Sequence, residues 1–155
     1  MTLIKSISGI RGTIGGKPGE GLSPIDIVKF TSAYASFIQQ KAGKDNVKIV
    51  VGRDARMSGS IVNALVTNTL AAKGCNVVDI GLATTPTTEI AVPLENANGG
   101  IILTASHNPK QWNALKLLNE DGEFLNDAEG KTILALAESG DFRYAPVDLL
   151  GKIEY

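Results

Sequence analysis

Apolar residues recur at helical spacing early in the chain. The repeat comprises Ile27, Val28, Phe30, Tyr34, Phe37 and Ile38. Positions three and four apart lie on one face of a helix, so this stripe predicts an amphipathic helix with one buried face. Ser23 is a suitable N-cap, Pro24 suits the first helical position, and Asp26 has the spacing of a capping box. The helix is therefore predicted to begin after Ser23 and to end at Gly43.

Short apolar runs alternate with further helical patterns after this helix. The predicted strands cover 47–51, 76–80 and 99–103. The predicted helices cover about 60–73, the stretch from Thr85 to Val92, where Pro93 interrupts the pattern, and about 126–138. Strands joined by helical crossovers form mostly parallel sheets with helices on both faces. The pattern predicts an α/β fold, a three-layer α/β/α sandwich with a mixed, mostly parallel sheet.

One strand is reached by a loop and not by a helix. Residues 115–119 and 123–125 flank the turn Glu120-Asp121-Gly122, which indicates a hairpin. We expect the strand from Leu115 to be the antiparallel member of the sheet. Alternation along it puts Lys116 on the face opposite Leu115 and Leu117.

Composition limits the class of protein. The sequence has 155 residues, 43% of them hydrophobic, and a formal net charge of −1. Residues 1–140 are predicted to form one domain with its own core, and 141–155 an irregular tail that leads to a further part of the polypeptide, which the resemblance described below implies to be a second domain. The near-zero charge provides no basic field, so we expect neither a nucleic-acid partner nor a membrane partner.

The single cysteine, Cys75, excludes an internal disulfide and fits a reducing compartment. The start of the sequence has no long apolar segment, so we expect no leader peptide and no transmembrane helix. The predicted location is the cytoplasm, with Cys75 as inert filler in the core.

The strongest candidate for chemistry is the segment Thr104-Ala-Ser-His-Asn-Pro109. It follows the predicted strand 99–103, and Pro109 forces Asn108 out of helical geometry. Ser106 is therefore expected on a bent loop at the carboxyl end of a strand, where ligands bind in open α/β sheets. An ordinary polar turn is the alternative for these residues alone.

Two further segments combine glycine with arginine. Four glycines in residues 8–16 surround Arg11, whose planar fork of donors suits phosphate. A flexible surface turn is the alternative there. Arg53, Asp54 and Arg56 follow the predicted strand 47–51, and either hold their loop through a local ion pair or contact a substrate.

Taken together, these segments resemble the α-D-phosphohexomutase family, which includes phosphoglucomutase, phosphomannomutase and phosphoglucosamine mutase. Thr104-Ala-Ser-His-Asn-Pro109, followed by Asn113 and Lys116, is similar to the phosphoserine loop of that family. Further matches in the family's order are Ser8-Gly-Ile-Arg-Gly12, Gly52-Arg-Asp54 through Ser58-Gly59, and Thr85-Pro86. The resemblance covers essentially the whole chain and implies the first of four domains, with a four-stranded sheet. One departure is Ala114, where the family usually has glycine.

The resemblance implies a mechanism. Phosphorylated Ser106 would give its phosphoryl group to a hexose monophosphate, and the resulting bisphosphate would reorient and return its other phosphoryl group. Mg²⁺ would bind a phosphate oxygen on Ser106, and a sugar 1,6-bisphosphate would act as activator. By the resemblance, Lys116 and Arg11 are the candidates for proton transfer or for polarising the attacking hydroxyl. We favour Lys116 as the acid or base and an electrostatic role for Arg11, because arginine stays protonated. His107, Asn108 and Thr104 would support the phosphate and its loop.

The resemblance leaves the specific hexose phosphate open. The three-aspartate magnesium loop of the family has no counterpart here, and Asp121-Gly122-Glu123 is better explained as a solvated turn. We expect the other metal ligands in the remaining domains of the same polypeptide, without which the fragment should be inactive. Two other classes are alternatives: a serine hydrolase, which adjacent Ser106 and His107 fit poorly, and a non-catalytic module that binds sugar phosphates.

Overall fold

A mixed β-sheet forms the centre of the structure, a computed structural model that describes residues 1–7 and 9–155. The strands are β1 (Leu3–Lys5), β2 (Gly9–Thr13), β3 (Lys48–Arg53), β4 (Asn76–Leu82), β5 (Gly99–Leu103), β6 (Trp112–Leu118) and β7 (Ile153–Glu154), in the spatial order β1-β2-β6-β5-β3-β4-β7. β3 pairs in parallel with β4 and β5, and β4 with β7. The neighbours β1–β2, β2–β6 and β5–β6 are antiparallel. The mixed sheet and its antiparallel β6 are confirmed, but the described residues form seven strands, not four.

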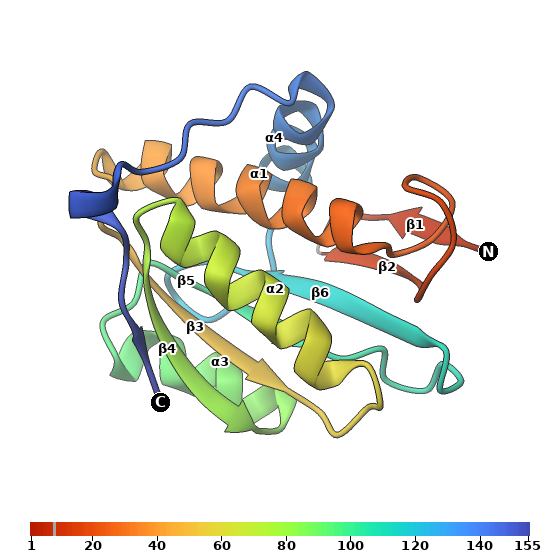
Figure 1. Ribbon diagram of the computed structural model, residues 1–155. Helices are drawn as coiled ribbons and strands as arrows, with labels where there is room; N and C mark the ends of the chain where they lie inside the picture. The colour runs from red at the N-terminus through yellow and green to blue at the C-terminus, as the bar shows by residue number, and fades with distance from the viewer. Residues whose placement is uncertain (8) are drawn as a thin grey trace.

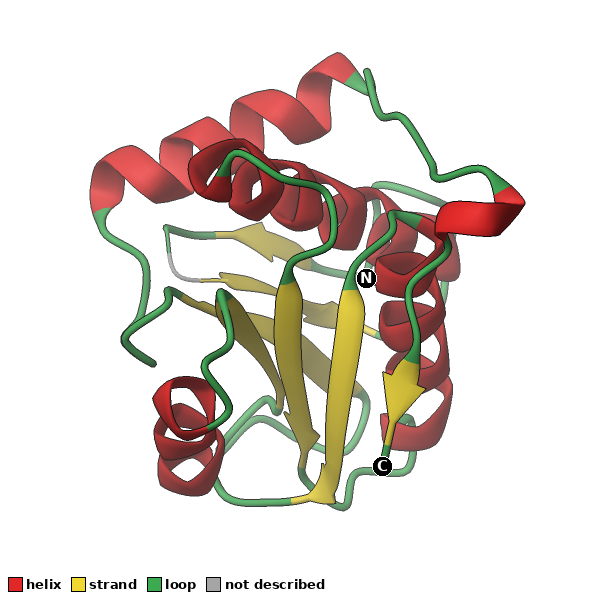
Figure 2. Cartoon of the chain, turned by 90° about the vertical axis from the view of Figure 1, so that its left-hand side faces the viewer, coloured by secondary structure: helices red, strands yellow, loops and turns green. Residues whose placement is uncertain are grey.

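Helices cover both faces of this sheet. They are α1 (Pro24–Ala42), α2 (Gly59–Ala72), α3 (Thr85–Leu94) and α4 (Asp127–Ser139), with a short 3₁₀ helix at Val147–Leu149. In Figure 1, α1, α2 and α4 lie on one side of the sheet and α3 lies on the other. Figure 2 shows the sheet between these two helical layers. The predicted α/β/α sandwich is therefore confirmed.

Local signals fix the ends of α1. The Ser23 hydroxyl accepts a hydrogen bond from the Asp26 N–H (3.3 Å), and the Asp26 carboxylate accepts one from the Ser23 N–H (3.2 Å). This reciprocal capping box satisfies donors that the first helical turn leaves free. Gly43 closes the other end in the left-handed region, with φ of 70°.

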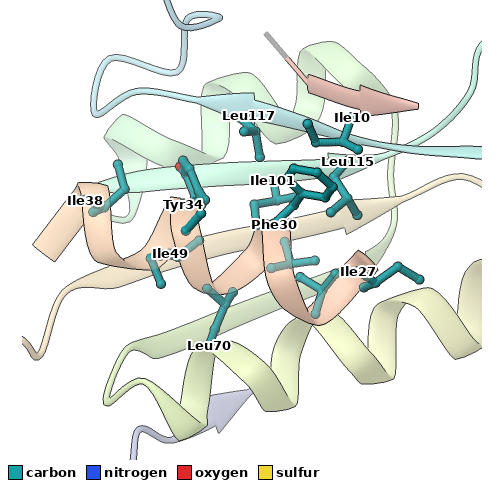
Figure 3. Packing of buried hydrophobic residues seen from close by; sticks show 14 of the residues in the cluster. Ile10, Ile27, Phe30, Tyr34, Ile38, Ile49, Leu70, Ile101, Leu115 and Leu117 are labelled. Carbon is teal, nitrogen blue, oxygen red and sulfur yellow. The ribbon is translucent and has the colours of Figure 1, made fainter. Parts of the chain in front are cut away.

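The main core lies between the sheet and the layer of α1, α2 and α4. Figure 3 shows its large side chains: Ile10, Ile27, Phe30, Tyr34, Ile38, Ile49, Leu70, Ile101, Leu115 and Leu117. A smaller cluster of Val50, Val92, Ala97, Ile102 and Leu118 packs beneath α3. Strands that are buried on both faces explain why 47–51 and 99–103 read as continuous apolar runs.

The two faces of β6 determine where Lys116 points. Leu115 and Leu117 belong to the main core, as alternation predicted. Lys116 pairs with Ile102 of β5, which lies in the cluster beneath α3. Paired residues in an antiparallel ladder share a face, so Lys116 projects on the side of the sheet that carries α3.

Around Arg11, the first glycine-rich segment is not the flexible surface turn that was considered as an alternative. Gly9–Thr13 is strand β2 and not a loop, and it lies between β1 and β6. Arg11 therefore projects from a sheet, opposite Ala114 of β6. Ser8, which the resemblance included, lies outside the described residues.

Two element boundaries also differ. Helix α3 continues through Pro93 to Leu94, because a proline in the last turn costs one backbone hydrogen bond while Glu95 N–H still reaches the Ala91 carbonyl (2.9 Å). The expected hairpin is reduced to a single bridge between Leu118 and Phe124.

The tail after α4 packs on the body of the domain. Ala145 N–H donates to the Ala72 carbonyl (2.7 Å) and Gly151 N–H to the Ala71 carbonyl (2.9 Å). Apart from the 3₁₀ helix and the two-residue strand β7, which pairs with β4, the tail has no regular secondary structure, as expected. A Cβ at Gly151 would lie 1.7 Å from the Cys75 carbonyl oxygen, so the close approach of the tail requires glycine there.

None of the helices in the described part of the chain combines the length and the apolar character that crossing a membrane requires.

Candidate active site

The loop between β5 and β6 presents Ser106 to solvent. All five residues of β5 are buried, and the chain turns sharply after Thr104. The Thr104 hydroxyl accepts a hydrogen bond from the Ser106 N–H (3.1 Å), and the Asn108 N–H donates to the Ala105 carbonyl (3.0 Å). Ser106 has φ of 52°, in the left-handed region that residues with a side chain rarely adopt. The loop thus holds an exposed hydroxyl on a constrained backbone at the carboxyl end of β5.

Lys116 and Arg11 bring positive charge to this hydroxyl from neighbouring strands. Lys116 Nζ donates a hydrogen bond to Ser106 Oγ at 3.1 Å. Arg11 Nη1 donates to Asn108 Oδ1 (3.4 Å), and its guanidinium lies 5.9 Å from the centre of the Trp112 ring. The antiparallel pairing of β2 with β6 puts Arg11 and Lys116 on one face of the sheet.

A small cavity adjoins these two cations. Its volume is about 190 Å³, and its lining comprises Ile4, Ser6, Gly9, Ile10, Arg11, Ala114 and Lys116. The Ala114 backbone is extended within β6, so the alanine that departs from the family pattern needs no positive φ. The substitution therefore fits the site without backbone strain.

Asp54 connects the end of β3 to the Ser106 loop. Its Oδ2 accepts a hydrogen bond from the Thr104 hydroxyl (2.6 Å) and lies 3.4 Å from Arg56 Nε, and its Oδ1 accepts from the Arg56 N–H (3.1 Å). The ion pair considered from the sequence is therefore present. Arg53 stays on its own segment, where Nη1 donates to the Asp54 carbonyl (3.4 Å).

Arg56 reaches further than the sequence indicated. Its guanidinium donates to four main-chain carbonyls of the Ser106 loop and the start of β6, those of Ser106, Asn108, Pro109 and Trp112. Buried Asn113 also ties this loop to the start of α2, because its Nδ2 donates to Ser58 Oγ (2.9 Å). These contacts join segments about fifty residues apart, and the sequence alone carries no signal for them.

His107 is exposed, and within residues 1–7 and 9–155 its side chain has no hydrogen bond. Ser106 Oγ is bonded to Lys116 and not to its neighbour His107. The geometry therefore lacks the serine–histidine pair that a hydrolase needs. Hydrogen bonds from His107 and Asn108 to a phosphate remain a prediction.

The chain offers no complete metal site in its described part. No group of three or more His, Cys, Asp or Glu side chains is close enough to hold an ion there. The Asp54 carboxylate is engaged with Thr104 and Arg56, and the Asp121–Glu123 turn is closed by the Asn119 side chain, which accepts both N–H groups (2.9 and 3.0 Å). Mg²⁺ would need ligands from outside these residues.

Comparisons with known proteins agree with this architecture. Residues 3–144 match the family model described as phosphoglucomutase/phosphomannomutase, alpha/beta/alpha domain I. A phosphoglucomutase/phosphomannomutase of Thermococcus kodakarensis is 34% identical over 144 residues, covering 92% of this chain and 31% of the relative. A probable phosphoglucosamine mutase of Methanosphaera stadtmanae is 36% identical over 151 residues, covering 96% and 32%.

A solved structure supports the same conclusion. The crystal structure of a putative phosphomannomutase from Thermus thermophilus superposes with a TM-score of 0.79 and 28% identity, covering 98% of this chain and 32% of that one. The chain thus spans about a third of the length of these relatives. With its helices on both faces of a mixed sheet and its match over residues 3–144, the chain belongs to the α-D-phosphohexomutase family, as domain I of the phosphoglucomutase/phosphomannomutase type.

Proposed function

We propose that this domain carries the phosphoryl group of a phosphohexomutase on Ser106. The observation that supports the proposal most directly is the hydrogen bond from Lys116 Nζ to Ser106 Oγ (3.1 Å) on an exposed, constrained loop. A phosphate ester of serine resists hydrolysis, so Ser106 can store a phosphoryl group between turnovers. Arg11, on the same sheet face, adds positive charge where the phosphate would lie.

In the forward step, a hydroxyl of the bound sugar monophosphate attacks the phosphorus. The bond from phosphorus to Ser106 Oγ breaks as the bond to the sugar oxygen forms, and the proton of the attacking hydroxyl ends on Ser106 Oγ. Lys116 is the group within hydrogen-bond reach of that oxygen, so it is proposed to give its proton to the departing serine and to take up the proton that the attacking hydroxyl loses, which leaves its own charge unchanged. The reoriented bisphosphate then returns its other phosphoryl group by the reverse step. Transfer of this kind needs mainly positioning and charge neutralisation.

The proposal includes a hexose phosphate substrate, a sugar 1,6-bisphosphate activator and Mg²⁺. The metal would neutralise charge on the transferring phosphoryl group, with further ligands from the remaining domains. Relatives are named both as phosphoglucomutase/phosphomannomutase and as probable phosphoglucosamine mutase, so a glucosamine phosphate is the second candidate substrate.

The test is the Ser106→Ala variant of the complete protein, with intact-mass measurement of phosphate after incubation with glucose 1,6-bisphosphate. We expect the parent protein to gain one phosphate at Ser106, and the variant to gain none and to lose mutase activity with an unchanged melting temperature. Near-normal turnover of Ser106→Ala would refute the assignment. Binding of sugar phosphates without phosphorylation of Ser106 would instead identify a non-catalytic module.

A further inference from the structure

Arg56 is bonded to the Ser106 loop through its side chain alone. Nη2 donates to the carbonyls of Ser106 (3.0 Å) and Asn108 (2.7 Å). Nη1 donates to the carbonyls of Pro109 (2.8 Å) and Trp112 (3.1 Å). A guanidinium has five N–H donors in a fixed plane, and these four bonds use all four donors of its two NH₂ groups.

The fifth donor, the Nε–H, is buried beside Asp54 and makes no hydrogen bond to the described residues. Arg56 Nε lies 3.4 Å from Asp54 Oδ2, and only 12% of the Arg56 side chain is exposed. The same carboxylate oxygen accepts the Thr104 hydroxyl, which in turn accepts the Ser106 N–H. Asp54 therefore orients the guanidinium on one side and the amino-terminal half of the loop on the other.

Four of the five N–H groups are thus bonded to the loop and the fifth is buried, so Arg56 has no exposed N–H to offer a phosphate. Arg56 instead affects the site through the loop backbone, because its hydrogen bonds orient four carbonyl oxygens toward the guanidinium. Carbonyl oxygens carry partial negative charge, and any of them turned toward a phosphate dianion would repel it. With the carbonyls engaged, Ser106 Oγ is left facing Lys116.

We propose that Arg56 is a positioning residue for phosphoryl transfer: it holds the Ser106 loop in the left-handed conformation that directs Oγ to Lys116. The inference rests on the proposed function, since it assumes that Ser106 is the phosphoryl carrier. Arg56 acts through the carbonyls of the loop and touches neither the sugar nor the phosphate.

The test uses Arg56→Lys and Arg56→Ala in the complete protein. A lysine ammonium is a single donor centre and cannot span four carbonyls on a planar fork, so both variants should misplace Ser106. We expect kcat to fall by roughly 10², the scale of a misplaced reacting group, with KM nearly unchanged. Free guanidinium ion should restore part of the kcat of Arg56→Ala, because it fits the space that the truncation opens.

A second readout reports on the loop itself. Backbone hydrogen exchange in residues 104–111, measured by mass spectrometry, should be faster in both Arg56 variants than in the parent. Arg143→Ala is the matched control, since Arg143 is exposed and its guanidinium has no hydrogen bond within residues 1–7 and 9–155. That control should match the parent in kcat and in exchange.

Normal kcat in both Arg56 variants, or a loss of kcat that guanidinium leaves unchanged, would overturn the positioning role. Ser106→Ala, assayed in parallel, separates this failure from that of the proposed function. If Ser106→Ala is inactive while Arg56→Ala is normal, only the Arg56 proposal fails. If Ser106→Ala is active, the proposed function fails as well.

Discussion

Ser106 combines an exposed hydroxyl with a backbone that its neighbours hold in place. Its N–H is bound by Thr104, its carbonyl by Arg56, and its Oγ by Lys116. A positive φ at a residue other than glycine costs free energy, and surrounding contacts must compensate for it. The site thus depends on the segments that follow β3 and β5 and on β6 together.

We predict that Arg11→Ala and Lys116→Met reduce turnover far more than stability. Arg11 is exposed and Lys116 is half-buried, so neither removal opens a core cavity. In the complete protein each should lower kcat by roughly 10², the usual effect of a positioned acid–base or charge-stabilising group. Steady-state kinetics and thermal unfolding measure the two effects separately.

Lys44→Met is the control for charge removal. Lys44 is exposed between α1 and β3, at the opposite end of the sheet from the Ser106 loop. It should leave kcat unchanged. If activity and melting temperature fall in parallel in the Arg11 and Lys116 variants, the two residues have a structural role instead.

The type and place of the site residues could be predicted from the sequence, but most of their contacts could not. A serine before Pro109 and after a buried strand indicates a bent loop at a strand end, and Ser106 is found there. No strand was predicted around Arg11, because the glycines obscured the short strand β2. Its contact with Trp112 depends on the pairing of β2 with β6, which is a property of the tertiary fold.

At the scale of elements, Tyr34 joins α1 to the two strands that flank the site loop. Its hydroxyl accepts the Gly100 N–H of β5 (2.9 Å) and donates to the Leu118 carbonyl of β6. The side chain is fully buried, and this burial raises the pKa of Tyr34 well above its usual value. The phenol therefore stays protonated and remains a donor.

We predict that Tyr34→Phe lowers the free energy of unfolding by about 1–3 kcal/mol, because a buried N–H and a buried carbonyl lose their partner. Urea denaturation measures the change. Tyr155→Phe serves as the control, since Tyr155 is 96% exposed. A change below about 0.5 kcal/mol for Tyr34→Phe would mean that the sheet satisfies these groups without the hydroxyl.

Lys41 connects α1 to α4 and to the turn after β6. Its Nζ lies 2.8 Å from Glu120 and 3.0 Å from Glu129. The hydrogen bond from Lys41 is the main cause that lowers the pKa of Glu120. Desolvation opposes the charge on Lys41, but its hydrogen bonds to both carboxylates outweigh this and raise the Lys41 pKa.

These shifts predict a pH-dependent contribution to stability. A carboxyl group whose pKa is lowered by folding stabilises the fold at pH values above its unfolded-state pKa, near 4.5. This stabilisation is lost as the pH falls through the folded-state pKa. Lys41→Met should therefore lower the melting temperature by roughly 2–4 °C near pH 7, the scale of an exposed ion pair. Calorimetry should show the difference shrinking toward about pH 3. A constant difference across this range would assign the loss to packing of the lysine stem.

Elements with strong local signals were predicted well, and those that depend on neighbours were not. The capping boxes at Ser23 and Asn126 fix the starts of α1 and α4 where the sequence indicated. β1 and β7 have three and two residues, too few for a hydrophobic period to appear. Such edge strands form because a neighbouring strand offers unpaired backbone groups.

At the scale of the whole molecule, the tail is part of the folded body. Lys73 is 6% exposed, and its Nζ donates to the Arg143 carbonyl (2.7 Å) and lies 5.6 Å from the centre of the Tyr144 ring. The Tyr144 hydroxyl also lies 2.8 Å from Ser32 Oγ on α1. These contacts hold the tail against α1 and the end of α2, while the domain boundary after residue 140 remains a prediction.

At the same scale, we expect this chain to contain what folding requires but not all that turnover requires. The main core, the capped helices and the seven strands lie within the 155 residues, so we predict that this chain folds alone with one cooperative unfolding transition.

The chain holds the proposed phosphoryl carrier and two cations, but its described residues gather no acidic cluster for Mg²⁺. Magnesium gives up its water reluctantly and needs further anionic ligands, so it should bind the isolated chain weakly. Among the described residues, the cavity beside Arg11 and Lys116 measures about 190 Å³, below the roughly 300–1,000 Å³ of ligand pockets, so we expect too little enclosure there for a bisphosphate to reorient. A coupled assay of the purified chain with the 1-phosphates of glucose, mannose and glucosamine, each with its activating bisphosphate, should therefore show no sustained turnover, while a complete relative assayed in parallel should be active. Turnover near that of the relative would mean that the active site is complete within this chain, and that the role assigned to the remaining domains is wrong.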